Sequence, residues 1–248
     1  IPSDLGPPST LWRNDAGAFT EIAESVGAAV SMAGMGVDGA DLNGDGLLDY
    51  CITDVGPPRC LQSDPSGIYV EPGAALGLMP AEWVEHAGTV GWSLDFADFD
   101  ADGNLELVQS GGPFPQEDSE EGVTFFDWPD LLWSSDDDGQ FTDVTAEAGF
   151  GDIANHTGLA TADFDGDGFL DIVVAGPINT PVLHMNTCGA GGWLMVELVG
   201  PLGNNEGFGA QVEIEDGTYR QTREVQSLRG VSQGPSRIHF GLGNRDEV

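Results

Sequence analysis

Short runs of apolar residues, bounded by glycine and aspartate, recur along this chain of 248 residues. Three of them, Tyr50–Thr53, Leu107–Val108 and Ile172–Ala175, come directly after stretches rich in aspartate. Short apolar runs between turn-forming residues are typical of β-strands. Helical patterns are nearly confined to brief Ala/Glu stretches such as Thr145–Ala148. The pattern therefore predicts an all-β protein.

A second pattern lies between the acidic stretches and combines an apolar start, an Asp/Gly turn and an aromatic residue. It occurs at Leu11–Ile22 and Leu132–Val144, with a weaker copy at Cys60–Val70. Each copy predicts a β-hairpin. Together with the apolar runs, one repeat then holds about four short strands, which is typical of a β-propeller blade. We expect a partial propeller of about three four-stranded blades over residues 1–187, with the acidic insertion 113–129 as a surface loop between blades.

The texture changes in residues 188–248, where apolar and polar positions alternate between turns rich in glycine and asparagine. This alternation predicts an antiparallel β-sandwich-like domain packed against the last blade. A propeller needs roughly four to eight blades to close. We therefore expect the chain to be a piece of a longer protein, whose other blades precede Ile1 or whose open edges a partner covers.

Charge restricts the partners of this protein. The chain has 42 acidic residues and 7 basic ones, for a formal net charge of −35. Nucleic acid and anionic membrane surfaces are unfavourable partners, because the electrostatic term has the wrong sign. No apolar stretch reaches the roughly 20 residues of a membrane helix, and no secretory signal is visible at the start of the chain.

The three acidic stretches are copies of one loop, with oxygen-bearing side chains at positions 1, 3, 5 and 9 and glycine at position 6. Such a loop gathers carboxylates around one point and suits calcium, which takes six to eight oxygen ligands, better than magnesium. We expect about three Ca²⁺ ions, each also bound by the backbone carbonyl of position 7, with a structural role. The predicted ligands are Asp41, Asn43, Asp45, Leu47 and Asp49 in the first loop, Asp98, Asp100, Asp102, Asn104 and Glu106 in the second, and Asp163, Asp165, Asp167, Phe169 and Asp171 in the third.

Two of the three cysteines flank a turn. Cys51 and Cys60 can face each other across a hairpin, either as a disulfide or as two small buried apolar residues. Cys188 is left over, and nothing near it in the sequence marks it as a nucleophile.

Motifs of nucleophilic catalysis, phosphate binding and dinucleotide binding are missing from the sequence. The four histidines are scattered and we interpret them as structural. Among the tryptophans, we expect Trp12, Trp133 and Trp193 to be buried in strands. Trp83 and Trp128 lie in predicted loops and are the better candidates for a binding face.

The hairpin phrases and acidic loops together resemble the FG-GAP/VCBS repeats of integrin-α-like propellers, most closely those of the cartilage acidic protein family. Residues 193–243 resemble the ASPIC/UnbV domain that follows such propellers, on matches that include Asn204-Asn205, Gln221-Thr-Arg223-Glu224-Val225 and His239-Phe-Gly-Leu-Gly243. The second loop departs from the pattern because it ends in Glu106 rather than aspartate. The resemblance implies secreted or surface-attached proteins without a shared enzymatic activity.

We therefore expect a non-enzymatic, calcium-binding adhesion, scaffold or assembly module at an extracellular, cell-surface or periplasmic location. Its partner would be another protein or the remainder of its own propeller. The alternative is a glycan-binding or glycan-cleaving propeller, in which the 113–129 insertion and the Trp83 loop would converge on one cleft.

Overall fold

The computed structural model describes residues 7–78, 90–112, 116–118, 122–124, 128–151, 153–177, 179–187, 189, 191–226 and 234–248. In these residues the regular structure consists of antiparallel β-strands and two 3-10 turns, Glu24–Val26 and Gly73–Leu76. The prediction of an all-β fold is confirmed. None of the described helices is long and apolar enough to span a membrane.

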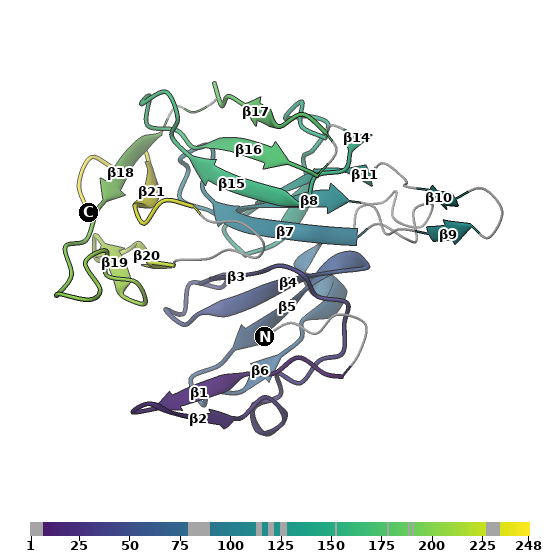
Figure 1. Cartoon of the computed structure of the whole chain (residues 1–248). Helices are drawn as coiled ribbons and strands as arrows, with labels where there is room; N and C mark the ends of the chain where they lie inside the picture. Colours follow the sequence, from purple (N-terminus) through teal and green to yellow (C-terminus); the bar gives the residue numbers. More distant parts are fainter. Residues whose placement is uncertain are drawn as a thin grey trace.

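Three sheets carry the acidic loops (Figure 1). In every one of them, the acidic loop connects the first two strands, as the sequence predicts. The first sheet contains β3 (Val37–Ala40), β4 (Asp49–Asp54), β5 (Gly56–Ser63) and β6 (Tyr69–Val70) in this order. The second contains β7 (Val90–Ala97), β8 (Glu106–Gly112), β12 (Leu131–Ser135) and β13 (Phe141–Asp143). The third contains β15 (Gly158–Ala162), β16 (Asp171–Ala175) and β17 (Val182–His184).

The first strands of the three sheets lie next to one another, β3 beside β7 and β7 beside β15. Apolar residues that alternate along the strands fill the space between the sheets. One buried cluster, which includes Leu94, Leu107 and Trp133, joins the first and second sheets. Another, which includes Val108 and Ile172, joins the second and third. The described sheets do not close into a ring.

The hairpin predicted at the start of the chain is formed by β1 (Trp12–Asp15) and β2 (Ala18–Glu21). Its two turn residues, Ala16 and Gly17, both have positive φ, as the tight turn of a two-residue hairpin requires. The expectation that Trp12 is buried is wrong, because its side chain is 47% exposed on this hairpin. Trp133, by contrast, is fully buried as predicted.

The acidic insertion lies within the second sheet, between β8 and β12, and not between two sheets as expected from the sequence. Its described parts form a hairpin of β9 (Gln116–Asp118) and β10 (Gly122–Thr124), and β11 (Trp128–Pro129), which pairs with β14 (Ile153–Ala154). Trp128 is therefore in a strand and partly buried. Local patterns did not reveal this position, since the strands that flank the insertion pair with each other across it.

The C-terminal strands form two antiparallel pairs around one small core. β18 (Gly192–Val196) pairs with β21 (Ile238–Gly243), and β19 (Gln211–Glu215) pairs with β20 (Arg220–Glu224). Phe240 lies at the centre of the shared core. In Figure 1 this unit, which we call the cap (residues 191–248), lies at one end of the sheets, and the β9–β10 hairpin lies at the opposite end. The predicted boundary at residues 187/188 falls between β17 and β18 and stays a prediction.

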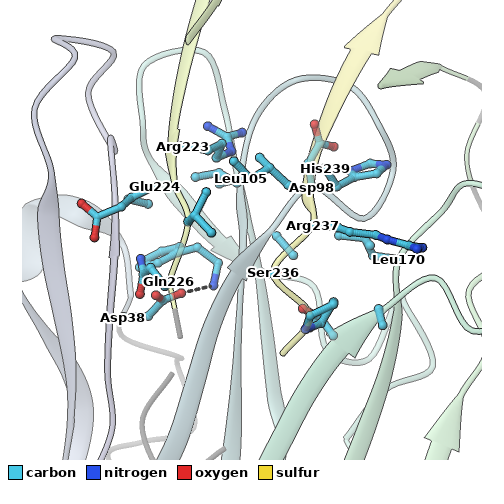
Figure 2. A pocket seen from close by; sticks show the side chains of 18 of the residues that line it. Asp38, Asp98, Leu105, Leu170, Arg223, Glu224, Gln226, Ser236, Arg237 and His239 are labelled. Carbon is cyan, nitrogen blue, oxygen red and sulfur yellow. Dashed lines mark hydrogen bonds between the residues drawn. The ribbon is translucent and has the colours of Figure 1, made fainter. Parts of the chain in front are cut away.

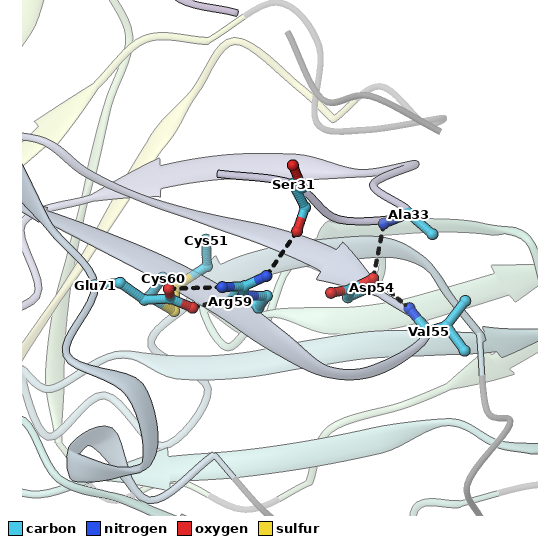
Figure 3. A network of polar contacts seen from close by, with 8 residues as sticks. All are labelled: Ser31, Ala33, Cys51, Asp54, Val55, Arg59, Cys60 and Glu71. Atoms are coloured by element: carbon cyan, nitrogen blue, oxygen red, sulfur yellow. Dashed lines mark hydrogen bonds and ion pairs between the residues drawn. A yellow bond between two sulfur atoms is a disulfide. The ribbon is translucent and has the colours of Figure 1, made fainter. Parts of the chain in front are cut away.

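A disulfide joins Cys51 on β4 to Cys60 on β5, directly opposite each other in the strand register. Beside it, Arg59 forms an ion pair with Glu71 and donates a hydrogen bond to the carbonyl of Ser31 (Figure 3). The disulfide therefore ties the two central strands of the first sheet, and the ion pair joins β5 to the segment that follows β6. Of the two alternatives for the cysteine pair, the disulfide is confirmed.

Candidate metal centre

Each acidic loop is closed by hydrogen bonds from its own backbone. The carboxylate at position 1 accepts the N–H of the position-6 glycine, at 2.9 Å, 3.0 Å and 3.1 Å in the three loops. The side chain at position 3 accepts the N–H of position 5, and the side chain at position 5 accepts that of position 7. These contacts curl the backbone so that the side chains of positions 1 and 3 face inward.

Position 9 connects each loop to the rest of its sheet. Asp49, Glu106 and Asp171 are all buried and accept the N–H of loop position 2. Each also receives a hydrogen bond from the third-strand side of its sheet, and the donors are Ser63, Ser134 and Asn186. Hydrogen bonds from its own sheet therefore hold the last side chain of each loop in place.

Two loops gather three carboxylates each at the distance that one cation requires. In the second loop, oxygens of Asp98, Asp100 and Glu106 lie within 4.8 Å of one another. In the third loop, the same positions are occupied by Asp163, Asp165 and Asp171, with the same spacing. Position 3 of the first loop is Asn43, whose amide oxygen replaces the third carboxylate.

Burial disfavours the ionised form of two carboxylates in the second loop. Burial raises the pKa of Asp98 to about 7, although Arg223 opposes this shift, and burial raises the pKa of Glu106 well above its ordinary value. Burial likewise raises the pKa of Asp49 in the first loop to about 6. Asp98 is 2% exposed, and its Oδ1 has no hydrogen-bond partner among the described residues. A buried carboxylate oxygen without a partner is costly, and a cation bound by this oxygen-only set would remove the cost.

The structure places the predicted ligands in different ways. Side chains at positions 1, 3 and 9 converge in the second and third loops. The side chains of Asp45, Asp102 and Asp167 are held by the N–H groups of position 7. The carbonyls of Leu47, Asn104 and Phe169 stay predicted ligands, since the hydrogen bonds at these residues involve their N–H groups.

The cap covers all three loops at the same loop position, which sequence reasoning did not anticipate. A methyl group on the position-6 glycine would clash with a large cap side chain in every loop: Arg220 at Gly46, Tyr219 at Gly103 and Trp193 at Gly168. Trp193 lies on the third loop and stacks on His239. Its side chain is 43% exposed, so the expectation that it is buried is wrong. The available sequence signal was the arginines, since five of the seven lie at positions 220–245.

A cavity of about 190 Å³ lies between the cap and the first strands β3, β7 and β15 (Figure 2). Asp38, Asp98, Arg223 and His239 are among the polar side chains that line it. Burial lowers the pKa of His239, which favours the neutral ring, and its Nε2 donates a hydrogen bond of 2.9 Å to the carbonyl of Gly168. This bond is a second anchor between the cap and the third loop.

The remaining candidates from the sequence lie away from the loops. His156 is fully buried and pairs with Asp130 at 2.6 Å, in agreement with a structural role. Trp83, His86 and Cys188 lie outside the described residues, as do parts of the 113–129 insertion. The cleft expected for a glycan-active protein therefore stays a prediction.

Two parts of the chain match known protein families. Residues 122–174 match an FG-GAP-like repeat, and this span includes β12, β13 and the whole third loop. Residues 200–248 match the ASPIC and UnbV family, a span that includes β19, β20 and β21 of the cap. No curated protein matched the chain. The chain thus carries an FG-GAP-like repeat followed by an ASPIC and UnbV segment.

Proposed function

We propose that this chain is a calcium-binding module of an extracellular adhesion, scaffold or assembly protein, in which the ions are structural. The partnerless Oδ1 of Asp98, buried beside Asp100 and Glu106, is the observation that carries the proposal. The three loops have the same spacing of oxygen-bearing side chains, and each connects the first two strands of its sheet. This repetition supports a calcium site in every loop. The carboxylates then hold the architecture together and perform no chemistry.

In this proposal the three sheets are blades of a β-propeller of the cartilage acidic protein type. The side-by-side packing of β3, β7 and β15 supports this arrangement, because the first strand of a propeller blade lies nearest the axis. The partner is a further protein or further blades, and nucleic acid is unfavourable on charge. An extracellular address agrees with the disulfide, with the FG-GAP-like repeat, and with the abundance of free calcium outside cells.

Calorimetric titration of the metal-free protein with Ca²⁺ tests the proposal, with Mg²⁺ as the competing ion. We expect about three sites and a melting temperature that falls markedly in excess EDTA. The variant Asp163→Asn removes a carboxylate from the third loop and should lose one site, whereas Glu147→Gln, which changes an exposed acid outside the loops, should lose none. An EDTA-insensitive melt together with no calcium heat would refute the proposal.

A further inference from the structure

The cap presents its positive charge to the acidic loops across one groove. The groove has a volume of about 690 Å³. One wall carries acidic side chains of the first two loops and of the β12–β13 turn, and the opposite wall carries arginines of the cap. The acidic residues are Asp41, Asp102, Asp136, Asp137 and Asp138, and the arginines are Arg220, Arg223 and Arg245.

These arginines do not pair directly with the loops. Arg220 forms its ion pair with Glu213 at 2.7 Å, and Arg245 forms one with Asp216 at 3.4 Å, both within the cap. Among the described residues, no ion pair crosses the groove. The cap therefore compensates the charge of the loops at a distance and leaves their oxygens available.

Arg223 lines both the groove and the cavity that border the second loop. It lines the groove beside Asp102 and also the cavity beside Asp98. Its guanidinium is fixed by a 2.6 Å hydrogen bond to Gln221 and lies over the ring of Phe240, 5.6 Å from the centroid. These two contacts hold the guanidinium in place beside the second loop.

We propose that Arg223 is a fixed counter-charge for the second loop, which competes with the cation bound there, so that the cap sets the calcium affinity of this loop. The inference rests on the proposed function. Two positive charges near the same carboxylates repel each other, and the repulsion is strong where water is scarce. By reciprocity, calcium in the second loop weakens the electrostatic attraction that holds the cap.

The test compares Arg223→Met, which keeps an apolar stem against Phe240, with Arg223→Lys, which keeps the charge. In calorimetric titrations with Ca²⁺, Arg223→Met should tighten one site by about tenfold, and Arg223→Lys should stay within about threefold of the unmodified protein. The matched control is Arg237→Met, because Arg237 lines the same cavity but is 61% exposed and pairs with Glu197. It should leave all sites unchanged.

The outcomes separate the inference from the function beneath it. If the unmodified protein binds no calcium, the proposed function fails. If a folded Arg223→Met binds calcium with unchanged or weaker affinity, the counter-charge inference alone fails. If Arg223→Met does not fold, hydrogen exchange of the unmodified protein decides. Calcium should then protect the amides of β8, which follows the second loop, more than those of β20, and equal or greater protection in β20 would overturn the inference.

Discussion

Thr161 Oγ1 donates a 2.6 Å hydrogen bond to Oδ2 of Asp95, and both side chains are buried between the first strands of the second and third sheets. A carboxylate also joins the first and second sheets, where Asp38 accepts the backbone N–H of Phe96 at 2.9 Å. Both aspartates lie three residues before an acidic loop, and Ala160 occupies the equivalent position in the third sheet. Successive sheets are therefore joined by a repeated carboxylate contact.

The first prediction concerns this contact between sheets. Thr161→Val keeps the shape of the side chain but withdraws a donor from the buried carboxylate of Asp95. Because hydrogen bonds to charged groups contribute roughly 1.5 to 3 kcal/mol, we expect a loss of this size in the free energy of unfolding, measured by urea denaturation. Thr142→Val, on the exposed side of β13, is the control and should change it by less than about 0.5 kcal/mol. A similar effect of the two substitutions would contradict the role of Thr161.

The second prediction concerns the contact between the cap and the third loop. Gly168 and Gly17 have nearly the same positive φ, 96° and 99°. A methyl group on Gly17 meets nothing, whereas one on Gly168 clashes with Trp193. Gly17→Ala should therefore report the backbone strain alone, of about 1 to 2 kcal/mol, and Gly168→Ala should cost clearly more in thermal unfolding. Trp193→Ala in the Gly168→Ala background should recover part of the excess, and additive effects of these two changes would show that the cap does not press on this loop.

The third prediction is the pH dependence of the metal-free protein. The pKa of Asp98 is raised to about 7 and that of Asp49 to about 6, from an ordinary value of 3.8. Between about pH 4 and pH 7 the native state then binds more protons than the unfolded state, so the free energy of unfolding falls as the pH rises. In EDTA we expect a higher melting temperature at pH 5 than at pH 7.5. Excess calcium should raise the melting temperature more at pH 7.5, because ionised carboxylates bind the cation.

The net charge of −35 would lower stability with rising pH in the same direction. Asp98→Asn separates the two causes, since it removes the buried titrating group and changes the net charge only slightly. The difference between the two melting temperatures in EDTA should shrink in this variant. A metal-free melting temperature that increases from pH 5 to pH 7.5 would contradict the prediction.

The fourth prediction concerns the disulfide of the first sheet. Cys51 and Cys60 close a short loop, and the entropy of such a loop corresponds to roughly 2 to 3 kcal/mol. Replacing both cysteines by alanine should lower the free energy of unfolding by about this amount, without changing the number of calcium sites in a titration. Reduction of the unmodified protein by dithiothreitol is the control and should give a comparable loss. An unchanged denaturation midpoint in both cases would contradict the prediction.

Features that depend on local spacing are predictable from the sequence. The side chains of one loop lie within nine residues, so their alternation predicts the convergence of positions 1, 3 and 9 that the second and third loops show. The cysteines likewise flank a single turn. Contacts between distant segments depend on how the chain folds and are not predictable in this way. Arg223 lines a cavity together with Asp98, and Trp193 covers Gly168, only because the cap packs against the loop ends of three sheets. The same packing leaves Trp193 half exposed. The sequence did not predict this exposure, because contacts between segments far apart in the chain leave no periodic pattern.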